Sequence, residues 1–166
     1  MIKVSNLTKF YFIKGKKIPI LNNINFTINN YETTVILGLN GSGKSTLIRI
    51  LGGVENYQQG EIKITEKVSW PCALKSGFQS KLTARENIVF ICRVYLGNDK
   101  ELINKKIKFI KKFSETGKYF DYPISTFSQG MRARIAFGLA MSFDFDIYLS
   151  DESLAVGDLR FKAKCE

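Results

Sequence analysis

The 166-residue sequence has no histidine, three prolines, three cysteines and no long apolar run. No stretch approaches the ~18 uninterrupted apolar residues that a membrane-spanning helix requires, and the N-terminal residues MIKVSNLTKF do not predict a signal peptide. The odd number of cysteines, without metal-ligand spacing, predicts reduced cytosolic thiols at Cys72, Cys92 and Cys165. No internal repeat, low-complexity tract or sustained heptad pattern is present. These absences exclude a membrane span, a disulfide framework and a long coiled coil.

What is present is the composition of a globular protein, with 45% apolar and 24% charged residues. A chain of this length predicts one domain that buries roughly 70% of its unfolded surface. The net charge of +10 is compatible with binding to a nucleic acid, to an anionic membrane face or to a nucleotide, or with a role in solubility alone. Lysines are densest over residues 105–112, where a solvated helix face is a more common explanation than a binding site.

The most informative stretch is GLNGSGKST at residues 38–46, between an apolar run at 33–37 that predicts a strand and residues 47–51, which predict a helix. Glycines let such a loop approach a ligand closely, so that its N–H groups and the helix N-terminus face an anion. In such a loop a lysine binds the β- and γ-phosphates and a serine ligates Mg²⁺. The alternative interpretation of the stretch is a plain glycine-rich turn that binds no ligand. The stretch predicts an ATP site formed by Gly38, Asn40, Gly41, Ser42, Gly43, Lys44, Ser45 and Thr46.

Local patterns also predict the remaining elements. Period-two alternation and turn residues predict strands at 2–4, 24–28 and 61–64, with turns at 14–17, 29–32 and 58–60. Gly52 and Gly53 predict the end of the first helix. A capping box at residues 83–86 and apolar steps after Asp99 predict two further helices. The block from about 83 to 142 is therefore expected to be mostly helical.

A second motif lies near the end of the sequence, where an apolar strand at residues 146–150 leads into Asp151 and Glu152. Together with a phosphate loop, this strand predicts that Asp151 holds a metal and that Glu152 orients or deprotonates the attacking water. Between the two motifs, Ser128 is placed to cap a helix, and Gly130 lets an anion approach the first N–H groups. A helix cap without a ligand is the alternative, and the position just ahead of the acidic strand favours the ligand.

The segment STFSQGMRAR at residues 125–134 resembles the signature motif of ABC-transporter ATPases. With it, the whole chain resembles an ABC ATP-binding subunit, and it is most similar to the branch that exports capsular polysaccharide such as polysialic acid. The closer match is carried by WP at 70–71, GFQS at 77–80, TAREN at 83–87, GKYFD at 117–121, SQGMR at 128–132 and VGD at 156–158. The resemblance implies an ATPase that energises polysaccharide export for capsule biogenesis, peripheral to the cytoplasmic face of the inner membrane.

The resemblance also implies roles within one subunit. Tyr11 would stack on adenine, with Phe10 or Phe12 as alternatives. The catalytic residues would be Lys44, Gln79 and Glu152, and the Mg²⁺ ligands would be Ser45, Gln79 and Asp151.

Two partners are implied in the same way. Ser128 and Gly130 would contact the γ-phosphate held by a second subunit in a head-to-tail homodimer, and residues 153–158 would cross that interface. Gln129, also expected at the nucleotide, stands where the family commonly has a small residue. Gln79 would report to a polytopic membrane permease, on which the helical block would dock.

The implied fold is an α/β P-loop NTPase core with an antiparallel β subdomain and a helical signature subdomain, at about residues 83–142. All of it would belong to a single ABC ATP-binding domain over residues 1–166. Family members continue through another helix and strand to a histidine at the γ-phosphate, and this sequence has none. The expected domain is therefore incomplete at its C-terminus, with the last core strand or strands missing.

Three other functions compete with that of an active exporter subunit. A truncated, catalytically impaired remnant follows from the missing C-terminal segment. A DNA-associated ABC-type ATPase would place long coiled coils between the phosphate loop and the signature, but here that interval is short and lacks heptads. A small nucleotide kinase is disfavoured by the signature and by the acidic pair. We therefore expect no nucleic-acid partner.

Overall fold

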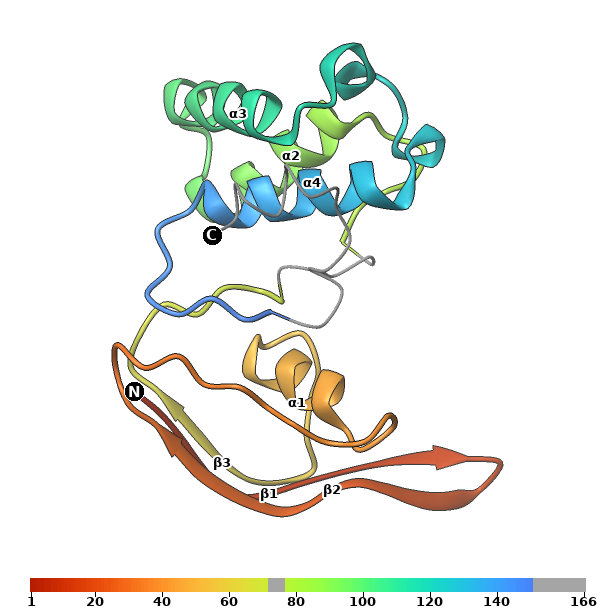
Figure 1. The fold of residues 1–166 in the computed structure, drawn as a ribbon, viewed down its shortest axis with the longest axis vertical. Coiled ribbons are helices and arrows are strands. Elements are labelled where there is room, and N and C mark those ends of the chain that lie inside the picture. The colour runs from red at the N-terminus through yellow and green to blue at the C-terminus, as the bar shows by residue number, and fades with distance from the viewer. Residues whose placement is uncertain (72–76, 151–166) are drawn as a thin grey trace. The chain divides into compact units, whose positions relative to one another are not determined.

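The computed structural model describes residues 1–71 and 77–150, which divide into two compact units. In the described chain, unit 1 comprises residues 1–71 and 145–150, and unit 2 comprises residues 77–144 (Figure 1). The phosphate loop belongs to unit 1, whereas Gln79 and the signature belong to unit 2. Each unit is described separately.

Unit 1 is built on a three-stranded antiparallel sheet with strand order β2-β1-β3. The strands are β1 (Ile2–Ile13), β2 (Lys16–Ile28) and β3 (Gln59–Ile64). Lys14 and Gly15 form the predicted turn between β1 and β2, with φ angles of 50° and 76°. Both strands of this hairpin are longer than the sequence predicted. The predicted turn at residues 58–60 is partly wrong, because Gly60 lies within β3, at a φ of 106°.

The predicted strand at residues 33–37 is wrong for the described chain. These residues join no ladder, and Val35 and Leu37 are 72% and 86% exposed. An apolar run of this kind becomes a strand when neighbours pair with it and cover both faces. Among the described residues, parallel pairing is limited to a single bridge between Val68 and Ile147. The predicted strand at 146–150 is likewise reduced to that bridge.

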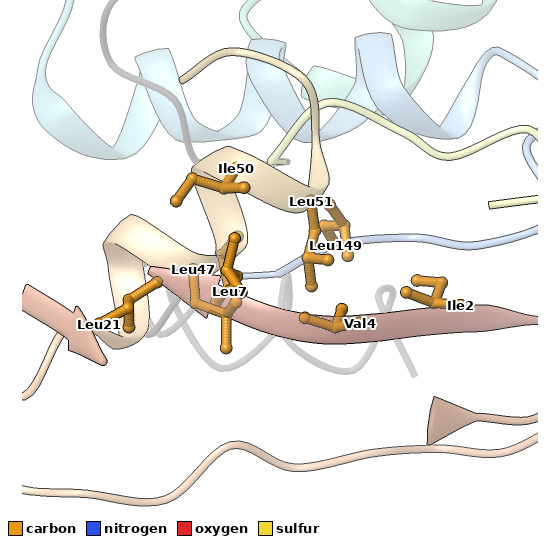
Figure 2. Packing of buried hydrophobic residues seen from close by; sticks show 9 residues of the cluster. Ile2, Val4, Leu7, Leu21, Leu47, Ile50, Leu51 and Leu149 are labelled. Atoms are coloured by element: carbon orange, nitrogen blue, oxygen red, sulfur yellow. The ribbon is translucent and has the colours of Figure 1, made fainter. Parts of the chain in front are cut away.

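Helix α1 (Lys44–Leu51) covers one face of the sheet (Figure 1) and carries the phosphate loop at its N-terminus. Figure 2 shows its apolar side chains gathered against β1, in a core of Ile2, Val4, Leu7, Leu21, Leu47, Ile48, Ile50, Leu51 and Leu149. The helix ends as predicted at Gly52, whose N–H donates to Ile48 O at 3.0 Å. Burial of α1 against the sheet therefore fixes the position of the loop that precedes it.

Unit 2 consists of α2 (Ala84–Leu96), α3 (Lys100–Ser114), the 3-10 helices η1 (Gly117–Asp121) and η2 (Ile124–Thr126), and α4 (Gln129–Met141). The predicted capping box is confirmed, with Thr83 Oγ1 accepting from Glu86 N at 3.1 Å. Asp99 caps α3 by accepting from Leu102 N at 2.9 Å. In the part of the chain that the structure describes, no helix is long and apolar enough to cross a membrane.

The lysine-rich helix α3 keeps Lys105, Lys108 and Lys112 exposed. The other two lysines of this stretch bind within unit 2. Lys106 donates to the carbonyl of Ser142, and Lys111 forms an ion pair with Asp121 at 3.2 Å. Part of the positive charge therefore stabilises helix packing.

Candidate nucleotide-binding site

The phosphate loop has a backbone that requires glycine at defined points. Gly41 and Gly43 adopt left-handed conformations, with φ angles of 83° and 95°. A Cβ on Gly43 would lie 3.0 Å from the carbonyl oxygen of Ile20, and one on Gly38 would lie 2.7 Å from Ser42 Oγ. Side chains at these positions would strain the backbone or displace their neighbours. The loop therefore keeps its backbone bare, as close approach to an anion requires.

The N-terminus of α1 is left open to such an anion. Its N-cap is Gly43, which offers no capping side chain, and the first turn contains no acidic residue. The unsatisfied N–H groups and the helix dipole together favour negative charge at this end. Lys44 Nζ donates to Gly38 O at 2.7 Å and to Leu39 O at 3.0 Å, so its charge lies over the loop.

The polar side chains of this stretch differ in burial. Asn40 and Ser42 are exposed in the loop, and Ser45 is half-buried in the first turn of α1. Thr46 is buried, and its Oγ1 accepts a hydrogen bond from Arg49 Nη2 at 3.1 Å. The structure thus gathers all eight predicted loop residues at one end of α1.

The aromatic residues upstream separate onto two faces of β1. Phe10 and Phe12 pack edge to face, with ring centroids 5.4 Å apart. Tyr11 lies on the opposite face with Lys9, and its hydroxyl donates to Glu55. Tyr11 is thus the half-buried aromatic on the face of the sheet that carries α1.

In unit 2, Gln79 is exposed within a loop that the buried side chain of Asn87 holds. Asn87 Oδ1 accepts from Gln79 N at 2.7 Å, and its Nδ2 donates to Gln79 O and Thr83 O at 3.1 and 2.9 Å. The same loop bonds to the segment ahead of the signature, since Ser125 N donates to Ser80 O at 2.9 Å. The structure therefore ties the Gln79 loop to the signature segment.

The signature residues stand at the N-terminus of α4. Ser128 is the N-cap, and its Oγ accepts from Met131 N at 3.2 Å. A Cβ added to Gly130 would meet nothing closer than Ser128 Oγ at 3.9 Å, and Gln129 is exposed. The predicted helix cap is confirmed, and Gly130 leaves room for one further carbon beside Ser128 Oγ. Asp151, Glu152 and residues 153–158 lie outside the described residues.

The sequence patterns did not reveal two sets of residues at these sites. One is Asn87, and the other is the charged group of Lys9, Arg49 and Glu55, which contacts both Tyr11 and Thr46. The available signal was the placement of Lys9 between Leu7 and Tyr11, at an inward position of an alternating strand. A charge at such a position is expected to need buried partners.

The loop, its helix and the sheet define a phosphate-loop nucleotide-binding protein. The family model described as ABC transporter matches residues 21–155, and the chain belongs to that family. It is 48% identical over 165 residues to the polysialic acid transport ATP-binding protein KpsT of Escherichia coli, covering 99% of this chain and 74% of the relative. It is 45% identical to the ATP-binding protein BexA of Haemophilus influenzae, covering 100% of this chain and 75% of the relative.

Solved structures agree with this assignment. The dimeric ATP-binding cassette MJ0796 bound to ADP and phosphate aligns with a TM-score of 0.77 at 25% identity, covering 99% of this chain and 79% of that one. The predicted family and its α/β ABC ATPase fold are therefore confirmed, and the chain is shorter than these relatives.

Proposed function

We propose that the chain is the ATP-binding and ATP-hydrolysing subunit of an ABC exporter that drives capsular polysaccharide across the inner membrane. The observation that carries the proposal is the bare glycine loop at the uncapped N-terminus of α1, with Lys44 over it. The similarity to KpsT and BexA supports the polysaccharide branch.

The nucleotide fits this site because every feature of the loop favours polyphosphate. The α1 N-terminus and the loop N–H groups would hold the phosphates, and Lys44 would exchange its carbonyl partners for phosphate oxygens. Tyr11, on the α1 face of the sheet, would stack on adenine.

Mg²⁺ suits the hydroxyl, amide and carboxylate oxygens of Ser45, Gln79 and Asp151. When bound, it would neutralise charge on the phosphates. Glu152 would orient or deprotonate the attacking water, and Lys44 would stabilise the transferring phosphoryl group. Ser128, Gln129 and Gly130 would serve the nucleotide of a second subunit in a head-to-tail homodimer.

The remaining assignments follow the same family pattern. Residues 1–166 form one ABC ATP-binding domain, in which a helical subdomain at about 83–142 docks on a polytopic permease. The subunit is peripheral to the cytoplasmic face of the inner membrane. The hydrogen bond between the Gln79 loop and the segment ahead of the signature supports a link, within unit 2, between a permease contact and the signature.

The test of nucleotide binding is a titration with a fluorescent ATP analogue. Lys44→Ala should abolish binding, because the phosphates lose the mobile cation of the loop. Lys63→Ala is the matched control, since Lys63 is an exposed lysine of β3 paired with Glu61 at 3.2 Å. Near-unchanged affinity in Lys44→Ala would refute the proposed phosphate site.

A further inference from the structure

A partly buried charged cluster lies beside the nucleotide loop in unit 1, and the proposed function does not use it. It consists of Lys9 on β1, Arg49 on α1 and Glu55 after α1, with Tyr11 at its border. Lys9 is only 6% exposed. Because burying an ammonium group is costly without partners, such a cluster indicates a position where charge is required.

One oxygen of Glu55 serves the base side of the proposed site. Glu55 Oε1 accepts from the Tyr11 hydroxyl and lies 3.0 Å from Lys9 Nζ. Lys9 Nζ also donates to Asn56 O at 2.6 Å and stands 4.7 Å from the centroid of the Tyr11 ring. The ring is thus held at its hydroxyl, with the ammonium group over one of its faces.

The other oxygen of Glu55 serves the phosphate side. Glu55 Oε2 lies 2.8 Å from Arg49 Nε, and the same guanidinium donates through Nη2 to Thr46 Oγ1 at 3.1 Å. Thr46 is the last residue of the phosphate loop. A single carboxylate therefore connects the aromatic ring of β1 to the hydroxyl that ends the loop.

The charge on this carboxylate is stable at neutral pH. Burial alone raises the pKa of Glu55, but hydrogen bonds from Tyr11, Arg49 and Lys9 together lower it to about 2. The hydrogen bond with Glu55 raises the pKa of Arg49. Glu55 therefore stays ionised at neutral pH, as a fixed hydrogen-bond acceptor.

We propose that Glu55 is a positioning residue that joins the two halves of the nucleotide site, orienting Tyr11 for adenine through Oε1 and Thr46 for phosphate through Oε2. This inference rests on the proposed nucleotide site. Without Glu55, Tyr11 regains rotamer freedom and Lys9 and Arg49 repel each other, so base and phosphate lose their common alignment.

The test compares the affinities of two ligands, ATP and inorganic tripolyphosphate, which lacks the base. Tyr11→Phe removes the hydroxyl alone and should lower ATP affinity by roughly fivefold while leaving tripolyphosphate affinity unchanged. Glu55→Gln should lower ATP affinity by about tenfold or more and tripolyphosphate affinity by only about two- to threefold. Combining both changes should alter the ATP-to-tripolyphosphate ratio no further than Glu55→Gln does.

Two further variants separate the contacts of each Glu55 oxygen from general destabilisation. We call the Oε1 contact with Tyr11 the base arm and the Oε2 contact with Thr46, through Arg49, the phosphate arm. Arg49→Lys interrupts the phosphate arm and should lower the affinities for ATP and for tripolyphosphate by the same factor. Glu61→Gln, at an exposed carboxylate of β3, should change neither. If Glu55→Gln does not fold, Tyr11→Phe still decides the base arm, because it deletes one atom from a half-exposed ring.

The outcomes distinguish this inference from the function on which it rests. A wild-type chain that binds neither ligand would overturn the nucleotide site itself, and the inference with it. A wild-type chain that binds both, with Tyr11→Phe and Glu55→Gln variants that keep the wild-type ATP-to-tripolyphosphate ratio, would overturn only the positioning role. Glu55 would then be a structural carboxylate.

Discussion

Glu55 is a half-buried carboxylate whose proton affinity changes when the chain folds. Burial raises its pKa, and the three hydrogen-bond donors that surround it lower it from 4.5 to about 2. Below pH 4.5 the Glu55 carboxylate becomes protonated in the unfolded chain, whereas in the folded chain it stays ionised down to about pH 2. The stabilisation from Glu55 is therefore complete above that pH and is lost as the pH falls toward about 2.

The lowered pKa of Glu55 predicts how the free energy of unfolding changes with pH. The free energy of unfolding of wild type minus that of Glu55→Gln should be constant from about pH 6 to pH 8 and should shrink below about pH 4.5. Urea unfolding at each pH measures it. Glu66, Glu86 and Asp121 also have lowered pKa values, but they are present in both proteins and cancel in the difference. A difference that stays flat to about pH 3 would contradict the ion pairs.

Two glycines of the phosphate loop give a second prediction, because they share a conformation and differ in surroundings. Gly41→Ala meets open space, so only left-handed strain of about 1–2 kcal/mol applies. Gly43→Ala adds a contact of 3.0 Å with the backbone of Ile20 and should cost about 2–4 kcal/mol. Thermal unfolding of both variants measures the contrast. Equal losses would mean that α1 does not hold the loop against β2.

At the scale of elements, α2 organises unit 2 through its first turns. The Asn87 side chain bonds to four backbone groups of the loop at residues 79–83, namely Gln79 N, Gln79 O, Leu82 O and Thr83 O, and the residue is 2% exposed. Asn87→Ala leaves several of these groups unpaired, at about 1–3 kcal/mol for each buried one. Urea unfolding should show a loss of about 2–4 kcal/mol, and exchange of the Gln79 amide hydrogen should accelerate. Asn104→Ala, on the exposed face of α3, should do neither.

The elements that the sequence predicted well are those with local signals. The capping box at Thr83 and the cap at Ser128 each involve partners three residues apart, so the pattern and the contact coincide. The Glu55 cluster was not predictable in this way, since Tyr11 and Glu55 are 44 residues apart. The strand at 33–37 failed for a related reason, because its formation depends on neighbours that no local pattern specifies.

At the scale of the whole molecule, the main feature is an apolar segment of unit 1 that is exposed to solvent. Four large side chains of the segment at residues 31–39 are exposed: Tyr31, Val35, Leu37 and Leu39. An uncovered apolar segment with unpaired backbone groups is prone to intermolecular pairing. We therefore expect residues 1–166, expressed alone, to aggregate as the protein concentration rises.

The same segment allows a sharp test, because neighbouring residues face opposite ways. Val35 and Leu37 point outward, whereas Ile36 is partly buried against the core of unit 1. Val35→Thr with Leu37→Thr should therefore reduce light scattering while changing the free energy of unfolding by less than about 0.5 kcal/mol. Ile36→Thr, the matched control, should cost about 1–3 kcal/mol, since it removes packed apolar atoms and adds a hydroxyl. If the outward pair destabilises as much as Ile36→Thr, residues 35 and 37 are buried in solution, and the segment has found the neighbours that make it a strand.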